Sequence, residues 1–372
     1  MSRHHIPLGR ILGIRIGLDY SWFLIFALLT WLLARSYYPA EFPSWSAPLY
    51  WSLGALTAIL LFVSVLLHEL GHSVVALAYR VPVPSITLFV FGGVAELGAE
   101  PPSARAEFLI AVAGPLVSAA LALGCYAIQP AVARMEPLLG LARYLTYINT
   151  AVVLFNLIPG YPLDGGRVFR AIIWAVTGSM RRATVVAASV GRFFGFAFIF
   201  LGVWQMFAGN LGDGLWIAFI GWFLESAAAG QVQQTLVHDL LAGRLVAHAM
   251  KRHAPTVPAD LPLQRLVDEY ILGGGQRAFL VNDAGRIIGL VTLHGVQGVP
   301  RAEWGRTTVR QVLLPLAQLK ATTPGADIGS ALEQMDRAGV NQLPVLEDGQ
   351  VAGMLSREDV ISFLRTLRAL RA

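Results

Sequence analysis

The sequence predicts an α-helical polytopic membrane protein of about six transmembrane helices, followed by a soluble α+β domain. Charged residues make up only 14% of the 372 residues, and the mean hydropathy is +0.60. An ordinary soluble domain contains about 25% charged residues. The apolar residues are concentrated between residues 20 and 230, while residues 245–372 have the composition of a soluble domain. We therefore expect a membrane domain over residues 1–235, a linker over 236–245 and a soluble domain over 246–372.

Six apolar segments approach the length needed to cross the hydrocarbon core of a bilayer. They cover residues 20–34, 49–69, 107–128, 144–159, 192–208 and 213–229. An even number of spans places both termini on one side. With the N-terminus inside, ten arginines from Arg3 to Arg192 lie at the inner face, and only Arg35, Arg134 and Arg143 lie outside, as the positive-inside rule expects. We predict a cell-membrane protein with cytoplasmic termini, whose basic residues face lipid headgroups rather than nucleic acid.

The most informative motif is HELGH at residues 68–72, directly after the uncharged segment 49–67. Residues four apart on a helix share a face, so His68 and His72 can hold one Zn²⁺ while Glu69 lies beside them as a base. Ionisable groups at membrane depth are costly, and they usually face a metal, water or the protein interior. Because Cys125 is the single cysteine, the remaining zinc ligands are expected to be nitrogen or oxygen atoms.

A catalytic zinc usually has three protein ligands, and Asp164 is the candidate for the third. It lies in NLIPGYPLDGGR at residues 156–167, where prolines and glycines interrupt the end of an apolar segment. Broken backbone at membrane depth is tolerated where it lines a cavity, which suits a metal site. The alternative is an interfacial turn in which Asp164 caps a helix that begins near Gly165.

The two motifs, in this order, resemble the two signatures of the site-2 proteases, which are zinc metalloproteases that cut within the membrane. The resemblance covers most of residues 10–230. It implies one Zn²⁺ per chain, a catalytic acid/base, and an asparagine that positions or polarises the scissile peptide. These roles fall on His68, His72 and Asp164 as zinc ligands, on Glu69 as the acid/base, and on Asn156 as the asparagine.

Two segments between the signatures have open roles. The segment from Ala113 to Ser118 resembles a small-residue motif of the family, with Ser118 where an asparagine is common. Close helix packing is the simpler interpretation of these small residues. Residues 84–97 are rich in β-branched and aromatic residues and predict a β hairpin that turns at Gly92-Gly93. Similar proteins use such a membrane-associated hairpin to hold substrate by strand addition; the alternative is a hairpin that only covers the site.

The C-terminal region contains an internal repeat, in which residues 278–296 align with residues 342–360. Each copy reads as helix, strand, turn, strand, helix, and the pair resembles tandem CBS domains over residues 246–305 and 306–372. Such modules often sense adenine nucleotides. Ser356 and Asp359 resemble the phosphate and ribose signature of the module, although Ser followed by Asp is also a helix-capping pattern. Gly295 replaces the acidic residue in the first copy, so a purely structural or dimerising role remains equally open.

These features predict a zinc endopeptidase that hydrolyses peptide bonds within or near transmembrane segments, with the CBS pair as its cytoplasmic regulator. The expected partners are a transmembrane protein substrate, the lipid bilayer, ATP, ADP or AMP, and a second copy of the chain through the CBS pair. The strongest alternative is an ion transporter or channel gated by the CBS pair, in which the same polar residues form an ion path. A scaffold without proteolytic activity is a third hypothesis.

Overall fold

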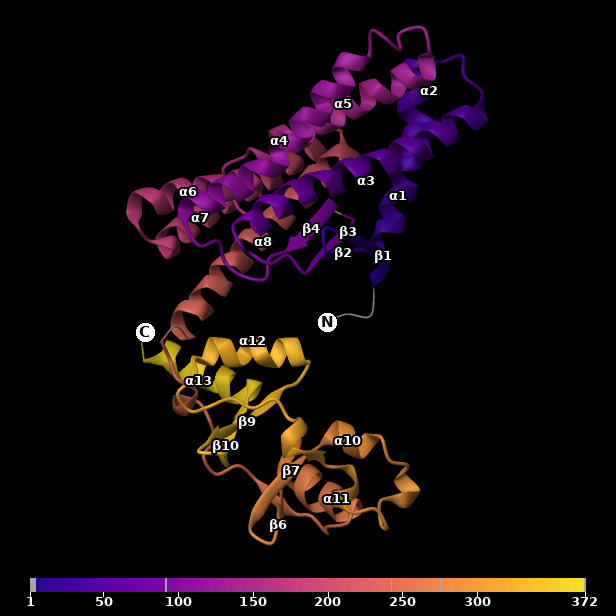
Figure 1. The fold of residues 1–372 in the computed structure, drawn as a ribbon. Helices are drawn as coiled ribbons and strands as arrows, with labels where there is room; N and C mark the ends of the chain where they lie inside the picture. The colour runs from indigo at the N-terminus through magenta and orange to yellow at the C-terminus, as the bar shows by residue number, and fades with distance from the viewer. Residues whose placement is uncertain (1–4, 91, 242, 275, 371–372) are drawn as a thin grey trace. The chain divides into compact units, whose positions relative to one another are not determined.

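The computed structural model describes residues 5–90, 92–241, 243–274 and 276–370 (Figure 1). The chain divides into two compact units, Met1–Thr235 and Leu236–Ala372. Among the described residues of the first unit, six helices are long and apolar enough to cross a membrane, which confirms the predicted fold class. The helices of this unit are α1 (Ser21–Leu32), α2 (Tyr38–Glu41), α3 (Ala47–Ala78), α4 (Ala104–Ile128), α5 (Glu136–Asn156), α6 (Asp164–Thr177), α7 (Met180–Phe207) and α8 (Leu211–Leu241).

Several helices are longer than the apolar segments that predict them. A π-helical turn, Leu33–Tyr37, joins α1 to α2, so the first span runs from Ser21 to Glu41. The fifth begins at Met180 rather than at residue 192, because arginines lower the hydropathy without breaking a helix. The sixth continues to Leu241, so most of the expected linker over residues 236–245 is helical. The short helix α6 is additional to the spans.

A four-stranded sheet packs against the C-terminal half of α3 (Figure 1). Its strands are β1 (His5–Ile11), β2 (Ile14–Asp19), β3 (Ser85–Phe89) and β4 (Gly92–Glu96), in that order. The hairpin predicted over residues 84–97 is present as β3 and β4. Its turn was placed wrongly, because Phe89 pairs with Gly92 and the two glycines open β4 instead. The N-terminal hairpin of β1 and β2 was not predicted, and β2 pairs with β3 in parallel.

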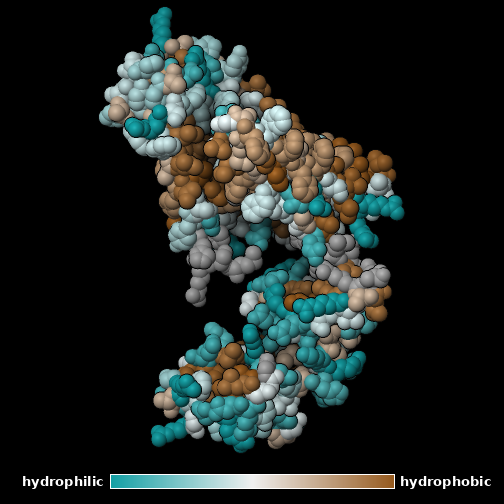
Figure 2. Space-filling model, turned by 180° about the vertical axis from the view of Figure 1, so that it is seen from behind, coloured by the Kyte–Doolittle hydropathy of each residue, from teal (hydrophilic) through white to brown (hydrophobic). Residues whose placement is uncertain are grey.

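The core beside the sheet is formed by aliphatic side chains from two strands and two helices. Ile16 of β2 and Ile86 of β3 pack with Ala76 of α3 and Ile110 of α4, and all four are buried. This core fixes the sheet and α4 against the stretch of α3 that carries the HELGH motif. By contrast, hydrophobic side chains cover much of the visible outer face of the helical unit (Figure 2), as expected for helices in contact with lipid.

The second unit contains two similar halves. Its sheets have the orders β5-β6-β7-β8 and β10-β9. The hairpins β6–β7 and β9–β10 turn at Ala284-Gly285 and Asp348-Gly349, which all have positive φ, as the two central residues of a type I′ turn require. The elements are β5 (Thr256–Pro258), α9 (Leu263–Arg265), β6 (Ala278–Asp283), β7 (Arg286–Thr292), α10 (Leu293–Gln297), α11 (Val309–Val312), β8 (Leu314–Pro315), α12 (Ile328–Ala338), β9 (Gln342–Glu347), β10 (Gln350–Ser356) and α13 (Arg357–Ala369).

Candidate metal centre

Two buried histidines of α3 form one side of the candidate metal centre. His68 and His72 lie one helical turn apart, and each is no more than 5% exposed. Their Nε2 atoms are 3.2 Å apart. The i, i+4 spacing therefore brings two imidazole nitrogens to one point, as the sequence predicts.

The carboxylate of Asp164 completes a group of three donors. Its Oδ2 lies 3.0 Å from Nε2 of His68, and its Oδ1 lies 3.2 Å from Nε2 of His72. Ligand atoms at about 2.0–2.1 Å from a tetrahedral zinc are separated by about 3.3 Å. The three side chains therefore fit a single zinc ion without large movement, and they leave a fourth position for water or substrate.

The second nitrogen of each imidazole is bound by α4. Nδ1 of His72 lies 2.7 Å from the carbonyl oxygen of Ile110, which can only accept, so this nitrogen carries the proton. Nδ1 of His68 lies 2.9 Å from Oγ of Ser118. Such partners fix the ring orientation and leave the Nε2 lone pairs for a metal. Ser118, whose role was open from the sequence, therefore contacts a predicted ligand directly.

Gly114 allows α4 to approach the two imidazoles. A Cβ atom at this position would lie 2.2 Å from Nε2 of His72 and 2.6 Å from Nε2 of His68. No side chain larger than hydrogen fits at these distances. The small-residue segment 113–118 thus does more than pack helices, because its glycine faces the candidate metal position.

The segment before α6 is folded tightly around the first turn of that helix. Asp164 is the first residue of α6, where the helix dipole favours a carboxylate. A Cβ at Gly166 would lie 2.3 Å from the backbone carbon of Gly160. The backbone of the segment before α6 therefore packs directly against the first turn of that helix. Tyr161 donates its backbone N–H to the carbonyl of Ala187 in α7 at 3.3 Å. These contacts fix where Asp164 enters the site.

Glu69 lies between the metal group and the hairpin. It is partly exposed, and the backbone of Ala95 in β4 lies within hydrogen-bonding reach of its carboxyl group. A Cβ at Gly93 would lie 2.6 Å from Cγ of Glu69, so β4 passes directly against this side chain. The predicted acid/base therefore borders a sheet edge.

Asn156 is the last residue of α5 and is half-buried. Within the described ranges its side-chain amide makes no hydrogen bond, and it is not part of the metal group. The structure thus brings together the two histidines and the aspartate, with Glu69 alongside, and leaves Asn156 without a described partner.

A cleft of about 860 Å³ separates the two halves of the second unit. Ser356 and Asp359 both line it, and they form the capping contacts of α13: Ser356 Oγ and N–H donate to Asp359 Oδ2 at 2.6 and 3.0 Å. Oδ1 of Asp359 pairs with Nζ of Lys251 at 2.9 Å. Arg277 and Lys320 add positive charge to the lining. The cleft is therefore suited to an anionic ligand.

The sequence interpretation did not single out a buried ion pair near the metal group. Glu107 of α4 is fully buried and binds Arg170 of α6. Glu107 in the apolar segment 107–128 could have indicated this ion pair, because acidic residues are rare in membrane spans and are usually paired. Arg170 had been assigned to the inner membrane face, but its side chain is buried in this contact.

Comparison with known proteins is consistent with this geometry. A model of Peptidase family M50 matches residues 56–136 and 130–201, and a model of the CBS domain matches residues 246–297 and 309–366. The chain is 38% identical over 371 residues to the zinc metalloprotease Rip3 of Mycobacterium tuberculosis, covering 98% of this chain and 94% of the relative.

Two further similarities extend the comparison. A Synechocystis protein named as a zinc metalloprotease is 34% identical over 369 residues, covering 98% of this chain and 97% of the relative. The solved structure of a site-2 protease from Methanocaldococcus jannaschii shares 28% identity over 62% of this chain and 95% of that chain, with a TM-score of 0.43. The relatives favour a protease over an ion transporter or an inactive scaffold. The chain belongs to Peptidase family M50, the site-2 proteases, and is a multi-pass zinc metalloprotease with a tandem pair of CBS domains.

Proposed function

We propose that this chain is an intramembrane endopeptidase in which His68, His72 and Asp164 hold one catalytic Zn²⁺ and Glu69 is the acid/base. The observation that carries the proposal is the convergence of three buried or nearly buried side chains, in which the two Nε2 atoms lie 3.2 Å apart and each lies within 3.2 Å of a carboxylate oxygen of Asp164. A zinc ion at this position supplies a Lewis acid for a peptide carbonyl and makes a bound water more acidic. The histidines lie on α3 and the aspartate on α6. The three side chains are therefore brought together by the tertiary fold and not by their spacing in the sequence.

Glu69 supplies the proton transfers of peptide hydrolysis. Its carboxylate takes a proton from the attacking water and returns it to the leaving amine. Asn156 is the proposed group for orienting the scissile peptide, since it ends α5 eight residues before Asp164.

The open edge of β4 supports substrate binding by strand addition. Phe89 and Gly92 close a hairpin with a two-residue turn, so they form a hydrogen-bonded pair and the pairs alternate from there. Gly93 and Ala95 therefore direct their backbone N–H and C=O groups away from β3, toward the open edge. Glu69 lies against both residues. A substrate segment that leaves its helical form and pairs here places its backbone beside the acid/base.

Substitution of Glu69 by Gln tests the protease function. Cells that express Glu69→Gln should accumulate intact membrane proteins whose fragments are present with the wild type, as measured by mass spectrometry of membrane fractions. The purified variant should retain one zinc per chain, because the ligands are unchanged. Identical fragment sets in the two strains would refute the proposal. Labelling of introduced cysteines from each side of the membrane would test the predicted cell-membrane location with both termini in the cytoplasm.

For the CBS pair we propose binding of an adenine nucleotide in the 860 Å³ cleft. Its support is the positive lining and the presence of Ser356 and Asp359 in that lining. Calorimetry of the full chain with AMP and with ATP tests this. Asp359→Ala should weaken binding, and equal binding by this variant would contradict the ribose role. If calorimetry detects no binding heat with any adenine nucleotide, the structural or dimerising role of the CBS pair would be favoured.

A further inference from the structure

A buried ion pair joins α4 to α6 beside the metal centre. Nε of Arg170 donates to Oε1 of Glu107 at 2.6 Å, and Nη2 of the same arginine donates to the same oxygen. The side chains are 7% and 0% exposed. Oε2 of Glu107 has no hydrogen-bond partner in the part of the chain that the structure describes. Buried ion pairs are often replaced by apolar residues without loss of stability, so stability alone does not account for this pair.

On α4 the ion pair lies on the helix face that borders the metal centre. Residues 107, 110, 114 and 118 of α4 follow a spacing of three or four and therefore share one face. This face carries the oxygen atoms that bind the two imidazoles and the glycine that faces them. On α6, Arg170 follows Asp164 by six residues, which is about 9 Å along the helix axis. One ion pair thus connects the helix that orients the histidines to the helix that carries the aspartate.

Arg170 also contacts the segment that leads into α6. Its guanidinium carbon lies 5.2 Å from the centroid of the Tyr161 ring, a distance at which a cation and an aromatic face attract each other. Tyr161 is in turn bound through its backbone to Ala187 of α7. The guanidinium therefore connects α4 and α6 and also contacts the segment before Asp164.

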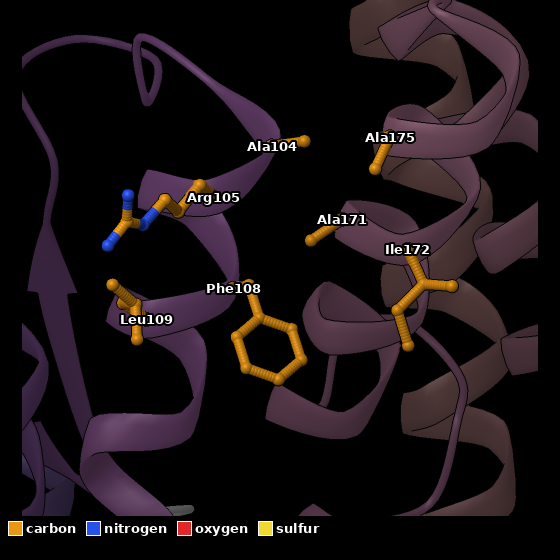
Figure 3. Close-up of a pocket in the computed structure, with 7 residues that line it drawn as sticks. All are labelled: Ala104, Arg105, Phe108, Leu109, Ala171, Ile172 and Ala175. Carbon is orange, nitrogen blue, oxygen red and sulfur yellow. The ribbon is translucent and has the colours of Figure 1, made fainter.

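An open groove lies between α4 and α6 beside the ion pair. It has a volume of about 390 Å³ and is lined by Phe108 and Leu109 on one side and by Ala171 and Ile172 on the other (Figure 3). Phe108 and Ala171 are the chain neighbours of Glu107 and Arg170. The ion pair therefore joins the two helices at the border of this groove.

We propose that Glu107 and Arg170 are positioning residues, which set the distance between Asp164 and the two histidines by fixing α6 against α4. The inference rests on the zinc centre proposed above. The two residues touch neither the metal position nor a substrate, so they act through the helices and through the Tyr161 segment.

The test measures zinc release from the full chain in detergent micelles. Glu107→Gln removes the negative charge of the side chain and keeps nearly the same shape. Arg170→Lys keeps the positive charge but loses the planar guanidinium and its paired N–H donors. Each should transfer zinc to a colorimetric chelator about 10-fold faster than the wild type, within the 10- to 100-fold range typical of groups that orient metal ligands. With Co²⁺ in place of zinc, the visible d–d bands should change shape. With a substrate identified from the Glu69→Gln comparison, kcat should fall while KM stays unchanged.

A matched control is available in the same unit. Arg192 of α7 pairs with Glu225 of α8 at 3.0 Å, and neither helix carries a proposed ligand. Glu225→Gln should therefore leave zinc release unchanged. Equal acceleration in Glu107→Gln and Glu225→Gln would show general loosening of the bundle and overturn the inference, as would wild-type release and cobalt spectra in Glu107→Gln. If Glu107→Gln does not fold, Arg170→Lys supplies the same readouts. A wild-type chain that binds no zinc would instead overturn the proposed centre.

Discussion

Gly114→Ala should remove zinc from the site while leaving the helices folded. The added methyl carbon would lie 2.2 Å from Nε2 of His72 and 2.6 Å from Nε2 of His68. Non-bonded heavy atoms pack at about 3.5 Å, so the nearer contact is short by about 1.3 Å. Both neighbours are the metal-facing atoms of their rings, so relief requires that α4 or the imidazoles move.

The expected loss of zinc affinity follows from how little a metal site tolerates displacement of its ligands. Catalytic constellations need their groups within about 0.5 Å of the productive geometry, and the required shift is more than twice that. We expect zinc affinity to fall at least about 100-fold, which corresponds to about 2.8 kcal/mol. The shift also separates His68 from Ser118, since α4 carries that partner.

The assay is equilibrium zinc binding to the full chain in buffers of stepped free Zn²⁺, with metal analysis of the protein. Gly124→Ala is the control, because Gly124 lies on the same helix and a Cβ there meets nothing within 4 Å. The control should bind zinc like the wild type. Circular dichroism should show equal helix content in all three proteins. Wild-type zinc affinity in Gly114→Ala would refute the assigned geometry.

Three further changes test separate parts of the molecule. Ser118→Ala removes the partner of His68 Nδ1 and should weaken zinc binding about 10-fold in the same buffers; no change would mean that the hydroxyl does not orient the ring. Ala95→Pro removes the edge N–H of β4 that lies beside the Glu69 carboxyl and should slow cleavage of an identified substrate without lowering zinc content, whereas unchanged cleavage would exclude a role for this edge position. Lys251→Ala releases Asp359 from an ion pair whose lysine is 62% exposed. Lys251 also contributes positive charge to the lining of the cleft. Exposed charge pairs contribute about 0.2–1 kcal/mol, so AMP should bind up to about fivefold more weakly by calorimetry, and tighter binding would show that release of Asp359 outweighs the lost positive charge.

The sequence singles out the three residues proposed to bind zinc, because zinc chemistry restricts residue type and spacing. Two histidines four residues apart on a helix in a membrane-spanning segment have few functions other than metal binding. Asp164 was a candidate through the broken backbone around it, which the structure explains by the close crossing of residues 160 and 166. The six spans followed from hydropathy, although their ends did not, since arginines at helix ends lower hydropathy but remain helical.

Other features depend on contacts between distant segments, which local patterns do not encode. The strand β2 pairs with β3, which begins 66 residues after β2 ends. Gly92-Gly93 was assigned to a turn on local preference. In the structure Gly93 lies within β4, where a Cβ would meet Glu69. The glycine therefore reflects the approach of the hairpin to the acid/base, and that requirement appears only when α3 and β4 are placed together.

In the proposed metal centre, α4 contributes no ligand but contacts each of the elements that do. In a membrane no hydrophobic force drives helices together, so association depends on close packing and on polar contacts. Along one face, α4 supplies both: Gly114 permits backbone-distance approach, while Ile110 and Ser118 bind the imidazoles and Glu107 binds α6. A signature defined by ligands alone cannot include such a helix. Substitutions on this face should therefore affect zinc binding more than substitutions of equal size on the faces of α4 that contact lipid.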